Sequence, residues 1–247
     1  MRYRNLILSA RLLSVVFRPY HAPIVGFVSL FTFTYLSLLP LFYKLTILCM
    51  VYVFTILLPR LCIYVYRKLN GWAPVQLRLR ENRAIPYILF ILSYVACLHL
   101  MFRMHMPRYM CGILVSALLI QMVCVIVNVW WKISMHSAGA GGVIGALVAY
   151  SVLFMFNPVW WLCVTVLISG AVGTARMLLR QHSLAQVVAG TLVGVVCGFA
   201  GIIFTCFYMN RQNISSCFCK IFHITNRLCN HQMHIHHLSD QTPCIPQ

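Results

Sequence analysis

The chain has 247 residues, of which 62% are hydrophobic and only 9% are charged, whereas an ordinary soluble domain carries roughly 25% charged residues. Its 19 Lys and Arg residues accompany only 2 acidic residues, Glu81 and Asp240, for a formal net charge of +17. A water-soluble globule would expose more charge, a disordered chain would be poorer in apolar residues, and a soluble nucleic-acid binder would have a mixed-charge surface. A multi-pass membrane protein is the class that remains, and most of its cations have no acidic side chain to pair with.

Apolar stretches approach the length of about 20 residues that a helix needs to cross a bilayer. They predict an all-α integral membrane protein, a polytopic bundle of about six or seven transmembrane helices. Pro59 predicts a kink within one of them. In chain order the predicted helices cover residues 24–39, 45–66, 86–102, 110–131, 143–156, 159–179 and 184–208.

The membrane helices set the domain organisation. Residues 1–20 carry several arginines through an apolar stretch, which predicts an interfacial N-terminal segment and no cleavable signal. Residues 21–208 form the helical membrane domain, and residues 209–247 are expected to be a polar, flexible tail. Most cysteines lie in apolar runs, where they act as small hydrophobic residues, and the His and Cys residues of the tail match no standard zinc spacing.

Three polar segments, 67–83, 132–142 and 176–183, follow the second, fourth and sixth predicted helices. Because successive helices cross the membrane in alternate directions, all three segments lie on the side of the N-terminus. We therefore expect them to meet at one membrane face and to form a single site.

The first polar segment ends in a dense cluster of cations, Arg78, Arg80 and Arg83, just before Pro86. Such a cluster at a helix entrance is typical of a positive-inside anchor. It is equally able to bind an anion.

The second polar segment, 132–142, contains Lys132, Ser134 and His136 and is rich in glycine. We interpret it as a glycine-rich loop that opens a helix at residue 143, where backbone amides and the helix dipole attract an anion. Ser134 can donate a further hydrogen bond, and His136 can exchange a proton near neutral pH. Close packing of small residues between helices is the alternative, but it leaves Lys132 and His136 unexplained.

The third polar segment places His182 four residues before Gln186. On a helix the two side chains share a face, so Gln186 can accept a hydrogen bond from one ring nitrogen and leave the other for nucleophilic attack. Gly190 and Gly194 continue that face and allow a close helix neighbour. A lone interfacial histidine would be ordinary, but a second histidine and three cationic segments on the same side favour a phosphate site.

This third segment resembles the signature of the type 2 phosphatidic acid phosphatase and vanadium haloperoxidase superfamily. In that signature Ser-Arg is followed after five residues by His and after three more by Asp, with Val and Gly beyond. The positions that keep the spacing are Arg176, His182, Val187 and Gly190.

Two earlier motifs of the superfamily also have counterparts, so the resemblance spans residues 78–194. Ser134 and His136 match the Ser and His of its Pro-Ser-Gly-His motif, and Arg83 with Pro86 is similar to the end of its Lys, six residues, Arg-Pro motif.

The resemblance implies an acid phosphatase-like hydrolase that removes phosphate from a lipid phosphate or polyprenyl diphosphate through a phosphohistidine. His182 would be the nucleophile, oriented by Gln186, and His136 the general acid. No metal and no cofactor is implied. The expected partners are an amphiphilic phosphorylated lipid and the bilayer, not nucleic acid, and the expected location is the bacterial inner (cell) membrane. The groups that would hold the phosphate are Arg80, Arg83, Lys132, Ser134, the loop amide near Met135, and Arg176.

The chain departs from the superfamily pattern at Gln186, where the signature has Asp, and at Ala175, where it has Ser. An amide can orient an imidazole but supplies no charge to stabilise its cationic form. A second hypothesis is therefore a non-catalytic phospholipid-binding membrane protein of the same fold with a degraded active site. A third hypothesis is a transporter. Paired broken helices in two related halves would support it, but the sequence has no such repeat.

Overall fold

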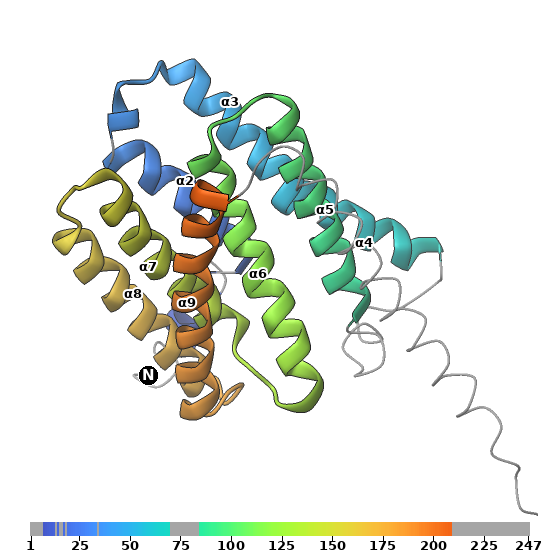
Figure 1. Ribbon diagram of the computed structural model, residues 1–247. Helices are drawn as coiled ribbons and strands as arrows, with labels where there is room; N and C mark the ends of the chain where they lie inside the picture. The colour runs from blue at the N-terminus through green and yellow to red at the C-terminus, as the bar shows by residue number, and fades with distance from the viewer. Residues whose placement is uncertain are drawn as a thin grey trace, which may run out of the picture.

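The structure is a computed structural model that describes residues 7–12, 14, 17, 19–33, 35–69 and 84–208. Every regular element in these ranges is helical, which confirms the predicted all-α class (Figure 1). The elements are η1 (Pro19–His21), α2 (Ala22–Phe33), η2 (Tyr35–Leu38), α3 (Leu41–Tyr52), η3 (Val53–Leu57), α4 (Leu58–Leu69), α5 (Ala84–Arg103), α6 (Arg108–Trp130), α7 (Met135–Phe154), α8 (Val159–Leu178) and α9 (Leu184–Tyr208).

Five helices in the described part of the chain are long and apolar enough to cross a membrane. They are Leu41–Leu69, Arg108–Asn128, Met135–Phe154, Val159–Leu178 and Leu184–Phe207. The two remaining predicted helices are also present as shorter apolar helices, Ala22–Thr32 and Tyr87–Arg103.

The predicted disturbance at Pro59 is a π-helical turn inside the 29-residue helix that α3, η3 and α4 form together. Proline has no amide hydrogen to donate, and its ring crowds the carbonyl four residues earlier. That carbonyl belongs to Thr55, which lies within η3. The wider π turn gives the ring room, so the helix continues through the proline.

The expectation of a glycine-rich loop up to residue 142 is wrong, because α7 begins at Met135 and contains Gly139, Gly141 and Gly142. Gly141 and Gly142 lie where α7 and α9 come into backbone contact. A Cβ atom at Gly141 would collide with the carbonyl oxygen of Thr191, and one at Gly194 with that of Ala138. The alternative, close packing of small residues between helices, is therefore confirmed.

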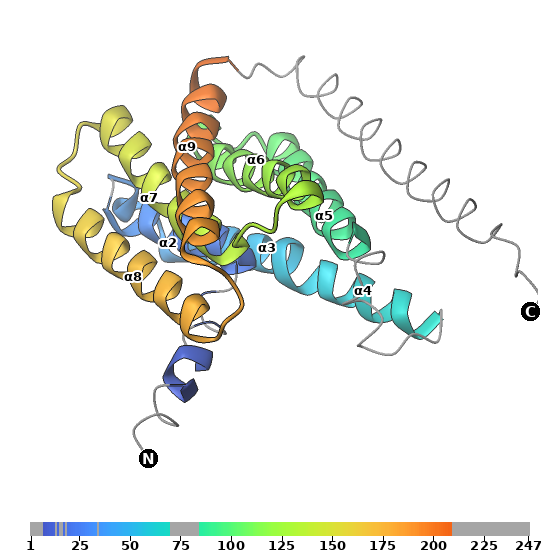
Figure 2. The same ribbon diagram turned by 90° about the horizontal axis from the view of Figure 1, so that it is seen from below.

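Helix α9 packs against both α6 and α7, and α8 covers the other side of α7 (Figure 2). Polar side chains tie these helices together inside the apolar core. The Ser116 hydroxyl on α6 donates to the Gly198 carbonyl on α9 at 3.0 Å, and the Tyr150 hydroxyl on α7 donates to the Tyr109 carbonyl on α6 at 2.7 Å.

Alternation of the helices places the chain connections at two ends of the bundle. The α6–α7 and α8–α9 connections lie together in the lower half of Figure 1, and the α5–α6 and α7–α8 connections lie in the upper half. The second and third polar segments therefore meet at one end, as their positions in the chain predict. Most of the first segment, residues 70–83, lies outside the described residues.

Candidate functional site

The candidate site is built on the N-termini of α7 and α9, which lie side by side. Ser134, the residue before α7, donates its amide hydrogen to the carbonyl of Gln186 in the first turn of α9, at 3.3 Å. Gly190 permits this approach, since a Cβ atom there would lie 2.6 Å from the carbonyl oxygen of Ser134. Two helix N-termini thus face the same region, and the first amides of each helix have no carbonyl partner within their own helix.

Gln186 is held by a capping interaction at the start of α9. Its side-chain oxygen accepts the amide hydrogen of Ser183 at 3.2 Å, and its own amide hydrogen points back to the Ser183 hydroxyl at 3.4 Å. This reciprocal pattern is a capping box. The capping box fixes the orientation of the Gln186 side chain without any ligand.

His182 lies at 3.1 Å from that same oxygen through its Nδ1 atom. The contact predicted from the sequence is confirmed, although His182 precedes the helix and does not share a helical face with Gln186. A backbone amide can only donate, so the Gln186 atom that faces Ser183 must be the oxygen, and Nδ1 of His182 must then carry the hydrogen. In the neutral ring the lone pair available for nucleophilic attack is then on Nε2.

Two cations lie near His182. Lys132 donates from Nζ to the Gln181 carbonyl at 3.0 Å, which joins the second polar segment to the third. Arg176, in the last turn of α8, donates from one terminal nitrogen to the Ser14 hydroxyl at 2.7 Å. The Nε atom of Arg176 is buried and has no hydrogen-bond partner among the described residues.

Burial lowers the pKa of His182, and the positive charges of Arg176 and Lys132 lower it further, against the raising effect of the hydrogen bond with Gln186. Desolvation disfavours the charged form of an imidazole. His182 is therefore kept neutral at pH values where a free histidine begins to protonate.

His136, at the second position of α7, lies on the wall of a cavity of about 220 Å³ between η1, α2, α7 and α8. His21, from η1, lines the same cavity. His182 contacts Gln186, and its partnership with His136 in catalysis stays a prediction.

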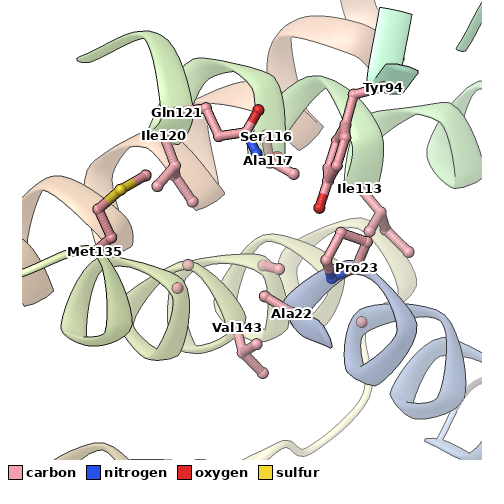
Figure 3. A pocket seen from close by; sticks show the side chains of 14 residues that line it. Ala22, Pro23, Tyr94, Ile113, Ser116, Ala117, Ile120, Gln121, Met135 and Val143 are labelled. Atoms are coloured by element: carbon pink, nitrogen blue, oxygen red, sulfur yellow. The ribbon is translucent and has the colours of Figure 1, made fainter. Parts of the chain in front are cut away.

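Ser134 and Met135 have structural roles that the sequence interpretation did not include. Ser134 is fully buried, and its hydroxyl caps α7 by accepting the Ser137 amide hydrogen at 3.4 Å and pairing with the Ser137 hydroxyl at 2.9 Å. The Met135 side chain lines a second cavity between α2, α5, α6 and α7, into which the Tyr94 hydroxyl also points (Figure 3). Their roles in phosphate binding stay predictions.

Arg80 and Arg83 lie outside the described residues, as do both acidic residues, Glu81 and Asp240. The described part of the chain therefore contains no carboxylate side chain to neutralise Lys132 or Arg176. Within the same ranges, no cluster of three His, Cys, Asp or Glu residues is placed to hold a metal ion.

Comparison of this chain with known protein families, with curated proteins and with solved structures found no match.

The structure adds four residues to the site that sequence reasoning missed. Ser183 could have been found, because Ser183-Leu-Ala-Gln186 fits the capping-box pattern at the start of an apolar run. Gln181 acts through its carbonyl, which every residue has. Ser14 and His21 come from the N-terminal region, far from the site in sequence, and no spacing pattern connects them to it.

Proposed function

We propose that this protein is a membrane-embedded phosphatase that hydrolyses a lipid phosphate or polyprenyl diphosphate through a phosphohistidine intermediate. It would be a divergent member of the type 2 phosphatidic acid phosphatase superfamily. The observation that carries the proposal is the contact of His182 with Gln186: the Gln186 oxygen lies 3.1 Å from Nδ1, while Lys132 and Arg176 supply positive charge beside the ring. This contact favours the tautomer in which Nδ1 carries the hydrogen and Nε2 is free.

In the proposed reaction, Nε2 of His182 attacks the phosphorus atom and the bond from phosphorus to the leaving oxygen breaks. His136 donates a proton to that oxygen, so the lipid leaves as a neutral alcohol or as a shorter phosphate. Water then gives a proton to His136 and attacks the phosphohistidine, the phosphorus–nitrogen bond breaks, and inorganic phosphate is released. The cations act by positioning and by stabilising charge, which account for most of the catalysis of phosphoryl transfer.

The membrane setting supports the choice of substrate. The site lies at one end of helices that are long enough to cross a bilayer, so an amphiphile can present its phosphate there and keep its apolar chain in lipid. The bacterial inner membrane stays a prediction.

The test is phosphate release from a panel of lipid phosphates and polyprenyl diphosphates by the purified protein, compared with His182→Ala and His136→Ala. We expect His182→Ala to abolish release and His136→Ala to slow it by roughly 10²–10⁴-fold, the usual contribution of a general acid. Release that is unchanged by His182→Ala would refute the phosphohistidine route.

A second candidate function is binding of a phospholipid without turnover. Gln186 favours it, because an amide leaves the imidazolium without a compensating charge, and so does the Ser14 hydroxyl that already occupies one nitrogen of Arg176. Saturable binding of lipid phosphates with no phosphate release would support this candidate over the phosphatase.

A further inference from the structure

The cavity that holds His21 and His136 continues into a longer groove on the outside of the bundle. A neighbouring cavity of about 170 Å³, distinct from the one at Met135 and Tyr94, shares Val25, Val143 and Thr165 with the cavity of about 220 Å³. Helix α7 forms the floor, with α2 on one side and α8 on the other. Along α7 the lining runs from His136 to Leu147, which at 1.5 Å per residue is about 16 Å, or half the thickness of a bilayer core.

The two ends of this groove differ in chemistry. One end holds the imidazoles of His21 and His136, and it lies at the membrane face where α7 begins. The rest is lined almost entirely by apolar side chains, down to Leu147 and Trp161. A polar head end and an apolar body match an amphiphile.

The surroundings of the groove favour a lipid as its occupant. Helices α7 and α8 are membrane-spanning by length and composition, and the apolar residues Val25, Val28 and Trp161 on the walls are exposed at the surface of the bundle. In a bilayer, the medium at this surface is hydrocarbon. Lys132 lies four residues before His136, at the same membrane face as the head end, and the described ranges contain no carboxylate side chain. An anionic headgroup is therefore favoured at this face.

We infer that this groove binds one hydrocarbon chain of an anionic lipid, with its headgroup at His21 and His136. The choice of a phosphate as the headgroup rests on the proposed function, whereas binding of the chain does not require turnover. His21 thereby becomes a headgroup-binding residue that no motif in the sequence indicates.

The test uses a 16-carbon alkyl phosphonate with a photoactivatable diazirine in the middle of its chain, a probe that no phosphatase can hydrolyse. The probe is added to the full-length protein in lipid nanodiscs, and the labelled residues are mapped by mass spectrometry. We expect labels on Val143 and Thr165 in the groove and few on Leu167, which is 74% exposed on α8 and reports contact with bulk lipid.

Thr165→Phe fills the groove and is expected to lower labelling at Val143 about tenfold, because excluding a few methylenes from a buried site changes affinity by that order. Thr174→Phe is the matched control: Thr174 lies on the same helix, is exposed, and like Thr165 donates its hydroxyl hydrogen to the carbonyl four residues earlier. Ala140→Leu, at another position on the groove wall, should act as Thr165→Phe does and guards against a folding defect in either variant.

The headgroup assignment is tested by competition between hexadecyl phosphonate and hexadecanol. The wild type should prefer the phosphonate, and His21→Phe, which keeps a ring but loses its nitrogens, should reduce that preference several-fold. A preference that is unchanged in both His21→Phe and His136→Phe overturns the headgroup assignment.

The outcomes separate this inference from the proposed function. Groove labelling that persists in a protein that hydrolyses no lipid phosphate supports the groove and refutes the phosphatase. Labelling as strong at Leu167 as at Val143, and insensitive to Thr165→Phe, overturns the groove whatever the turnover.

Discussion

At the scale of single residues, the site depends on one amide side chain that has two partners. The oxygen of Gln186 accepts hydrogen bonds from the Ser183 amide and from Nδ1 of His182. The first bond is structural and fixes the second, so a helix cap determines the tautomer of the candidate nucleophile. Gln186 does this without adding charge, which is where the chain departs from the superfamily it resembles.

The pH dependence of phosphate release tests this arrangement. In the proposed reaction neutral His182 is the nucleophile, so activity should fall as the pH drops through its pKa. Because burial lowers that pKa, the acid limb should lie below the value of about 6.5 for free histidine. Gln186→Glu keeps the acceptor oxygen and adds a negative charge, which raises the pKa of His182 and stabilises the charged phosphohistidine. We expect the acid limb to move to higher pH and turnover above it to rise roughly tenfold or more.

Gln186→Leu is the control for that experiment, since it removes both hydrogen bonds of the oxygen and should lower activity at every pH. Gln186→Asp restores the residue of the superfamily signature and should also raise turnover. Identical pH profiles for the wild type and Gln186→Glu would mean that His182 is not the titrating nucleophile.

At the scale of elements, the α7–α9 contact sets the site, because it brings the two helix N-termini together. The contact requires glycine on both helices, since a Cβ atom at Gly194 would collide with the Ala138 carbonyl of α7. The sequence showed these glycines, but the same residues suit an anion-binding loop and a helix interface, and local pattern alone did not decide between them.

Gly194→Ala should therefore destabilise the protein by about 1–3 kcal/mol, the usual cost of overpacking, and lower the proposed phosphate release with it. Gly170→Ala on α8 is the matched control, because a Cβ atom there meets nothing within 4 Å. It should be neutral or stabilising by up to about 1 kcal/mol, the gain in helix propensity. Thermal unfolding in detergent measures both changes, and equal effects of the two variants would contradict the packing explanation.

The turn from α8 to α9 is a second element with a clear test. Arg180 has a left-handed backbone with φ of 50°, and the amides of Arg180 and Gln181 bond to the carbonyls of Met177 and Arg176. This is the Schellman end of a helix, in which the left-handed position favours glycine.

Arg180→Gly should stabilise the protein by about 1 kcal/mol, since a left-handed backbone costs a residue with a Cβ atom roughly that much. Arg180→Ala removes the same charge and keeps the Cβ atom, so it should bring no such gain. The melting temperatures of the two variants compared with the wild type measure the difference. A higher melting temperature in both variants would mean that the gain comes from removing the positive charge of Arg180.

At the scale of the whole molecule, the alternation of helices separates two faces of the bundle. The His182 region and Lys132 lie at one face, where the Lys132 side chain reaches the Gln181 carbonyl. The turn between α7 and α8, which contains Asn157, lies at the other (Figure 1).

Labelling with a membrane-impermeant thiol reagent tests this arrangement. The background is a variant in which the exposed Cys49 and Cys163 and the four cysteines of residues 209–247 are replaced by Ser. In it, we expect Gln181→Cys and Lys132→Cys to react from the same side of sealed vesicles, and Asn157→Cys only from the opposite side. Reaction of Gln181→Cys and Asn157→Cys from one side would contradict the membrane topology.

We could predict from the sequence the helical class, the approximate positions of the seven predicted helices, and the proximity of His182 to Gln186. These follow from apolar length, from alternation of direction and from a short separation in sequence, which are all local properties of the chain. The His182–Gln186 contact is made at the cap of α9, however, and not on a shared helical face. It misplaced the start of α7 by eight residues, since it assigned residue 143 and the helix begins at Met135. Glycine disfavours an isolated helix, and only the packing of α9 makes a helical glycine run favourable.

The packing of the helices sets which groups share the site and what surrounds it. Ser14 reaches Arg176 across the chain, and His21 joins His136 in one cavity. These are distances between atoms that the covalent chain does not constrain, so they are set by how the helices pack.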